Sequence, residues 1–159
     1  MRNKLIFIST FALAYLMLAS GIVYARYLSD KDLNLKDVLP EASKFESVIR
    51  NKEVLYYKAK NKDGRLIGAV FKASAEGYLG DIETLVGMLK DGTISAIKII
   101  SHNETPGLGS RVSEQEFTSQ FRNIKDISRV QAITGATVSS SAVIKSVEKK
   151  AREIKEDLK

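Results

Sequence analysis

Two loops of this chain combine glycines and hydroxyl residues in a way that could support chemistry. The first, residues 133–141, reads Ile-Thr-Gly-Ala-Thr-Val-Ser-Ser-Ser and precedes a predicted helix. Free amide groups and the positive dipole end of a helix start can hold a phosphate without a lysine. The hydroxyls of Thr134, Ser139 and Ser140 would add donors. The loop therefore predicts an anion site, although Ser139 or Ser140 as a simple N-cap, with Gly135 making the turn, explains the same residues.

The second loop, residues 101–111, reads Ser-His-Asn-Glu-Thr-Pro-Gly-Leu-Gly-Ser-Arg. Pro106 stiffens it, because its ring fixes the backbone φ angle. Gly107 and Gly109 have no side chain, so the backbone can approach a flat ring closely. We expect this loop to border a planar ligand.

Composition removes several classes of chemistry. Cysteine is absent, which excludes disulfides, thiolate metal sites and iron-sulfur clusters, and a single histidine, His102, cannot build a multi-histidine metal site. Glycine-rich nucleotide motifs and the Gly-x-Ser-x-Gly elbow of serine hydrolases are also missing. The charge of +6 has no aromatic interleaving and indicates a solvated surface rather than a nucleic-acid interface. We therefore predict a carrier or binding module, with no metal site and no catalytic residue of its own.

The elements that must position these loops follow from turn signals and hydrophobic spacing. Two pairs of β-like runs are each joined through an Asp-Gly turn, which is the strongest short hairpin signal. Helical spacing marks a helix over 39–50, a short one over 113–121, and a last one beginning near Ser139 or Ser140 with one apolar stripe. The fold class is therefore α+β, an antiparallel sheet with flanking helices. The four strands are expected at residues 53–60, 65–74, 81–89 and 93–101.

An uncharged stretch from Leu5 to Ala25 is long enough to cross a hydrocarbon core. We interpret it as a single N-terminal transmembrane helix. A cleaved signal peptide is the rival interpretation, because small Ala25 ends the run. The expected domains are the anchor at 1–26, a linker with an amphipathic helix at 27–52, and a ligand-binding domain at 53–159.

Three ordered motifs resemble those of the FMN-binding domain family, which includes the Rnf G and Nqr C subunits. Residues 134–137, Thr-Gly-Ala-Thr, are similar to its flavinylation motif. Residues 77–87, Gly-Tyr-Leu-Gly-Asp-Ile-Glu-Thr-Leu-Val-Gly, resemble its Gly-Tyr-x-Gly-x-Ile-x-x-Leu-Val-Gly strand, and residues 102–109 its His-x-Glu-Thr-Pro-Gly-Leu-Gly loop. Gln131 stands where family members commonly have an aspartate.

The resemblance implies that FMN is esterified through its phosphate to Thr137 by a separate flavin transferase that uses FAD. It also implies that the second loop borders the flavin. For His102 and Glu104, a mutual contact that stabilises the loop is an equal alternative to flavin contact. Tyr78 could stack on the ring, but a half-buried strand residue is the commoner role. The expected cofactor-binding residues are Tyr78, His102, Glu104, Thr105, Gly107, Leu108, Thr134, Gly135, Ala136, Thr137, Ser139 and Ser140.

The function implied by the resemblance is electron relay in an Rnf-type, ion-translocating ferredoxin:NAD oxidoreductase complex. The expected partners are the other subunits of that complex, the flavin transferase and the membrane, with no nucleic acid. The soluble domain would lie on the extracytoplasmic side of the cell membrane. Two alternatives remain open: a stand-alone anchored flavin carrier, and an anchored adaptor whose loops bind another protein.

Overall fold

The computed structural model describes residues 33–159, so the predicted anchor lies outside the described residues. Within residues 33–159, no helix is long and apolar enough to span a membrane. Residues 35–50 and 54–159 form one compact unit, which contains the helices and nearly all of the sheet described below.

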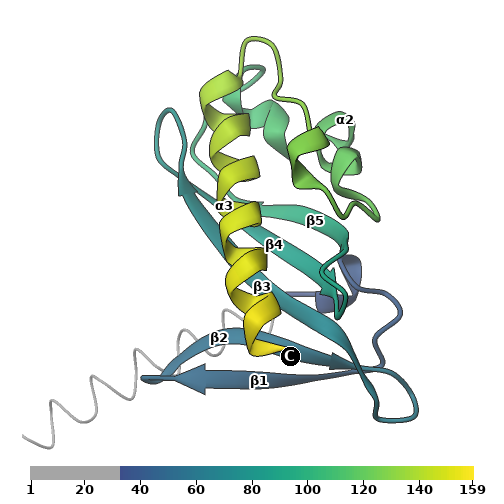
Figure 1. Ribbon diagram of the computed structural model, residues 1–159. Coiled ribbons are helices and arrows are strands. Elements are labelled where there is room, and N and C mark those ends of the chain that lie inside the picture. Colours follow the sequence, from purple (N-terminus) through teal and green to yellow (C-terminus); the bar gives the residue numbers. More distant parts are fainter. Residues whose placement is uncertain (1–32) are drawn as a thin grey trace, which may run out of the picture. The chain divides into compact units, whose positions relative to one another are not determined.

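A five-stranded sheet with the order β1-β2-β3-β4-β5 forms the body of the fold (Figure 1). The pairs from β2 to β5 are antiparallel, so the predicted α+β class and both predicted hairpins are confirmed. Gly64 and Gly92 have φ angles of 77° and 93° at the two Asp-Gly turns, which glycine adopts without steric cost. The strands are β1 (Lys44–Arg50), β2 (Glu53–Lys60), β3 (Leu66–Glu76), β4 (Asp81–Leu89) and β5 (Ile94–Ser101).

The helix predicted over residues 39–50 is wrong, because residues 44–50 form the edge strand β1. Phe45, Val48 and Ile49 are aromatic or β-branched, and such residues favour a pleated, half-buried strand. Pairing with β2 supplies the backbone hydrogen bonds that a helix would have made internally. Tertiary pairing thus outweighs an apolar spacing that fits a helix over only three turns.

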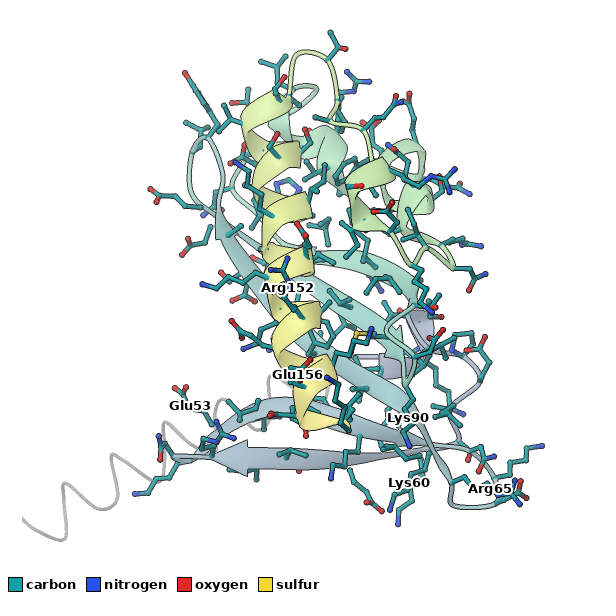
Figure 2. All side chains as sticks on the ribbon, in the orientation of Figure 1. Glu53, Lys60, Arg65, Lys90, Arg152 and Glu156 are labelled. Atoms are coloured by element: carbon teal, nitrogen blue, oxygen red, sulfur yellow. The ribbon has the colours of Figure 1, made fainter. Side chains whose placement is uncertain are left out.

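The last helix, α3 (Thr137–Asp157), crosses one face of the sheet over β3 and β4 (Figure 1). Its predicted apolar stripe is confirmed, and each larger aliphatic side chain in such a stripe contributes about 1.5–3 kcal/mol by leaving water. Arg152 and Glu156 project from the opposite, solvated side of α3 (Figure 2). The buried stripe consists of Val143, Val147, Ala151, Ile154 and Leu158.

A short segment before β1 covers the other face of the sheet. Val38 and Leu39 are fully buried there, just after the 3₁₀ turn η1 (Leu35–Asp37). They lie against Gly87 of β4, where an added Cβ would overlap the Val38 carbonyl. Lys98 of β5 reaches back to this segment through an ion pair with Asp37 at 2.7 Å. The sheet is therefore packed on both faces.

The predicted short helix near residues 113–121 is confirmed in outline, as α2 (Gln115–Thr118) followed by the 3₁₀ turn η3 (Ser119–Phe121). The 3₁₀ turn η2 (Gly109–Ser113) precedes α2. Phe117 and Phe121 are buried and meet edge-to-face, with ring centroids 5.5 Å apart. This aromatic pair fixes the segment against the end of the sheet where α3 begins (Figure 1).

Candidate functional site

A cavity of about 400 Å³ opens where the start of α3 meets the loop after β5. Such a volume falls within the range of small-molecule and cofactor pockets. The structure brings both predicted loops together there, although 35 residues separate Glu104 from Ser139. The cavity is lined by Tyr78, Glu104, Thr105, Leu108, Gly109, Gly135, Ala136, Thr137, Val138 and Ser139.

Four of the predicted residues do not line the cavity, namely His102, Gly107, Thr134 and Ser140. Gly109 and Val138 line it although neither is among the twelve expected cofactor-binding residues. The sequence did single out Gly109, because a residue without a side chain in the Pro-Gly-Leu-Gly run was expected to let the backbone approach a flat ring. Val138 carries no such signal beyond its place next to Thr137.

Thr137 is the first residue of α3, two or three positions before the predicted start near Ser139 or Ser140, and its side chain is exposed. Gly135 makes the preceding turn with a φ angle of 83°. Ala136 caps the helix without a side-chain hydrogen bond, so no capping group competes for the first-turn amides. The amides of residues 137–139 have no intrahelical acceptor and present the positive end of the helix dipole. An exposed hydroxyl thus stands at an anion-binding helix start.

The serine hydroxyls of this loop point inward. The Ser140 hydroxyl donates to the Ala136 carbonyl at 2.7 Å and accepts from the Ile133 amide at 3.1 Å. The Ser139 hydroxyl donates to the carboxylate of Glu104. Neither serine is the N-cap of α3, so the N-cap interpretation is wrong. Both hydroxyls instead make hydrogen bonds that hold the loop and the cavity wall in place.

The Glu104 carboxylate joins three segments of the cavity wall. It is only 4% exposed, and one oxygen accepts from the Leu79 amide at 3.0 Å. The Ser139 hydroxyl donates to the other oxygen, and the nearby Tyr78 and Gly80 amides also favour the charged carboxylate. Burial raises the pKa of Glu104, but these hydrogen bonds outweigh burial and leave the pKa below its ordinary value of 4.5. The group is therefore an ionised anchor for the wall.

Two glycines make room for that carboxylate. A Cβ atom at Gly77 would overlap one carboxylate oxygen of Glu104, and a Cβ atom at Gly109 would overlap the other. The Cβ at Gly109 would also crowd the Ser139 hydroxyl. Only glycine at both positions allows the close approach of loop, turn and helix.

The loop of Glu104 is itself a compact turn. The Glu104 amide donates to Nδ1 of His102 at 3.3 Å, so His102 supports the loop through the backbone. The Gly107 amide donates to the Ser110 hydroxyl at 2.9 Å, with a Gly107 φ angle of 73°. The Thr105 carbonyl accepts from the amides of Leu108 and Ser110. These bonds place Thr105 and Leu108 at the cavity.

The cavity wall also has an exposed apolar portion. Tyr78 is 72% exposed in the turn between β3 and β4, so its interpretation as a half-buried strand residue is wrong. Leu108 and Val138 are 54% and 56% exposed. A ring laid against these side chains would remove apolar surface from water. Apolar side chains, free helix amides and an exposed hydroxyl together fit FMN, which has a flat ring and a phosphate.

Comparison with known proteins identifies relatives of the whole domain. The family model for the FMN-binding domain matches residues 77–152. The G subunit of an ion-translocating oxidoreductase complex of Methanosarcina acetivorans is 36% identical over 126 residues, 69% of this chain and 67% of the relative. The G subunit of a proton-translocating ferredoxin:NAD(+) oxidoreductase complex of Clostridium ljungdahlii is 32% identical over 148 residues, 86% and 78% of the two chains.

Solved structures share the fold at lower sequence similarity. NqrC of Shewanella oneidensis superposes with a TM-score of 0.54 at 18% identity, over 76% of this chain and 74% of that one. The C subunit of the Na(+)-translocating NADH-quinone reductase of Parabacteroides distasonis gives 0.51 at 22% identity, over 63% and 60%.

Proposed function

Because the chain belongs to the FMN-binding domain family, as a relative of the G subunits of ion-translocating oxidoreductase complexes, we propose that it is an electron-transfer subunit that bears FMN on the Thr137 hydroxyl. The observation that carries this proposal is the position of Thr137. It is exposed, it lines the cavity, and it is the last residue of Thr-Gly-Ala-Thr at the start of α3.

The residues at the cavity have distinct roles in this proposal. The first-turn amides of α3 would hold the phosphate oxygens, and the helix dipole would stabilise their negative charge. Tyr78, Leu108 and Val138, which are exposed at the cavity, would hold the ring and keep water from part of it. Glu104 holds the wall in place through the Leu79 amide and the Ser139 hydroxyl. Bound FMN supplies one- and two-electron transfer, which no side chain of this cysteine-free protein supplies.

Attachment requires an activated phosphate donor. A flavin transferase that binds FAD provides one, because FAD contains a pyrophosphate bond. The Thr137 oxygen bonds to the flavin-side phosphorus of FAD, and the pyrophosphate bond to that phosphorus breaks. AMP leaves with the bridging oxygen, and the hydroxyl proton passes to solvent or to a base of the transferase. No change of oxidation state occurs, so no further reactant is needed.

The surroundings of the domain complete the proposal. Leu5 to Ala25 anchor it in the cell membrane, and the domain lies on the extracytoplasmic side as one subunit of an Rnf-type complex. A covalent bond suits this place, because a relay outside the cytoplasm cannot replace a lost cofactor. The anchor keeps the relay near its electron donor and acceptor at high effective concentration.

The test compares Thr137→Val with Thr134→Val, which makes the same change at another exposed threonine of the same motif. The variants are produced together with a flavin transferase and their intact masses are measured. Wild type and Thr134→Val should gain the mass of FMN less one water, whereas Thr137→Val should gain nothing.

Each contrary outcome has a definite meaning. Labelling of Thr137→Val would refute attachment at Thr137. A colourless, unlabelled wild type would favour an adaptor over an electron carrier.

A further inference from the structure

The loop that carries the proposed modification is held by side chains from elsewhere in the fold. Gln120, in η3, binds both main-chain polar groups of Gln131. Its Oε1 accepts from the Gln131 amide at 2.8 Å, and its Nε2 donates to the Gln131 carbonyl at 3.3 Å. This reciprocal pair holds both peptide groups that flank the Gln131 Cα atom, because a primary amide can satisfy a donor and an acceptor at once.

Two further contacts hold the same loop closer to Thr137. Nη1 of Arg111 donates to the Thr134 carbonyl at 3.3 Å, and Nη2 of Arg111 lies 3.6 Å from a Glu116 carboxylate oxygen. The Ser140 hydroxyl accepts from the Ile133 amide at 3.1 Å. The loop is thus held through its main chain at residues 131, 133 and 134.

These contacts leave the loop's own polar side chains available. Gln131, Thr134 and Thr137 are all exposed, and their side chains make no hydrogen bond within the described residues. A loop that is fixed by its backbone and displays its side chains is ordered before a partner arrives. Binding such a loop costs a partner less conformational entropy than ordering a flexible one.

We propose that Gln120 is a positioning residue that presents residues 131–137 to the flavin transferase in a preset conformation, with Arg111 supporting it. The proposal rests on the proposed attachment of FMN to Thr137. The hydroxyl must reach the phosphorus of FAD along one direction, and a misplacement of about 1 Å can slow such a step about a hundredfold. Gln120 acts through the loop and touches neither the flavin nor the reacting oxygen.

The test measures initial rates of flavin incorporation into full-length protein made without a transferase. Purified transferase and FAD are added, and the concentration of the acceptor protein is varied to obtain kcat and KM. Gln120→Ala should lower kcat/KM about tenfold or more, because the hydroxyl is then presented in many orientations. Gln115→Ala is the matched control, since Gln115 is an exposed glutamine of neighbouring α2 whose side chain makes no hydrogen bond within the described residues.

Two further readouts separate positioning from a general loss of structure. Gln120→Glu keeps the oxygen that accepts from the Gln131 amide, and it should recover part of the rate. Gln120→Ala that has been labelled to completion should show the wild-type flavin absorbance spectrum, because the cavity itself is unchanged. Thermal unfolding should place both alanine variants within a few degrees of wild type, because both Gln120 hydrogen bonds are exposed and contribute little to stability.

Equal kcat/KM for Gln120→Ala and wild type would overturn the positioning role while leaving the attachment at Thr137 intact. A rate loss that only follows a loss of folded protein would also overturn it. An unlabelled wild type would instead refute the attachment itself.

Discussion

Glu104 illustrates what is decided at the scale of single residues. The sequence places it in a loop beside a glycine-rich run and suggests either flavin contact or a mutual contact with His102. In the structure its carboxylate reaches Leu79 and Ser139, which lie 25 and 35 positions away in the sequence. The His102 ring accepts a hydrogen bond from the Glu104 backbone amide. The sequence could predict that Glu104 and His102 belong to the site. It could not predict their hydrogen-bond partners, because these depend on how the two hairpins and α3 come together in the fold.

The Glu104 network predicts a pH-dependent stability. Glu104→Gln replaces charge-assisted hydrogen bonds with weaker neutral ones, so the free energy of unfolding at pH 7 should fall by about 1–3 kcal/mol. The folded-state pKa is lowered, so the stabilisation is complete above the unfolded-state pKa and is lost as pH falls through the folded-state pKa. Urea unfolding of wild type and Glu104→Gln should therefore show a difference in unfolding free energy that becomes smaller as the pH falls below about 4.5.

Glu114→Gln is the control for that series, because Glu114 is exposed and its side chain makes no hydrogen bond within the described residues. It should change stability by no more than about 0.5 kcal/mol. If the difference in unfolding free energy between Glu104→Gln and wild type stayed constant as the pH fell to the acid transition, Glu104 would not be an ionised, hydrogen-bonded group.

At the scale of elements, local signals predicted the hairpins and the stripe of α3 but not β1. The Asp-Gly turns fix each hairpin over a few residues, and the buried stripe repeats over about four turns of one helix. The apolar residues of 39–50 have helical spacing, but they do not share one helical face in the structure. Leu39 is buried against Gly87, whereas Ile49 is 62% exposed on an edge strand. Sequence spacing cannot distinguish these cases, because the choice depends on β2 as a hydrogen-bonding partner.

The close packing of the Val38 backbone on Gly87 of β4 leads to a prediction for Gly87. Gly87→Ala would drive a methyl group into the Val38 carbonyl, which belongs to rigid backbone, so we expect a loss of about 1–3 kcal/mol in unfolding free energy. Denaturant unfolding monitored by circular dichroism measures it. Gly80→Ala is the control, because its Cβ would meet only the Asn103 side chain, at 3.9 Å.

Equal stability of Gly87→Ala and Gly80→Ala would show that residues 38 and 39 do not pack on β4 as described. The segment just before β1 would then be free of the sheet.

At the scale of the whole molecule, the family match covers both predicted loops. The cavity that they line could be recognised only from the fold. Residues 77–152 match the FMN-binding domain, and the strands β1, β2 and β3 extend the sheet before that match begins. The glycines and hydroxyls of the two loops drew attention to them, but only the resemblance to the FMN-binding domain family favoured a cofactor site over a simple N-cap. That they line one cavity, and that Gln120 and Arg111 hold one of them, depends on contacts between distant segments.

The proposed sidedness can be tested because the chain has no cysteine. Ile49→Cys introduces one thiol at a position that is 62% exposed on β1. A membrane-impermeant maleimide should label it in intact cells, or in intact spheroplasts if an outer membrane is present. Labelling that appears only after the membrane is permeabilised would place the domain in the cytoplasm.

The central claim concerns one hydroxyl, and peptide mass spectrometry tests it most directly. Trypsin cleaves after Arg129 and Lys145, so residues 130–145 form one peptide that contains Thr134, Thr137 and the serines that follow. In protein purified from cells that contain the transferase, we predict a flavin-phosphate adduct on every fragment ion that includes Thr137. N-terminal fragments that end before Thr137 should be unmodified. An adduct located on Thr134 or on a serine, or an unmodified peptide from a flavin-containing protein, would contradict the account.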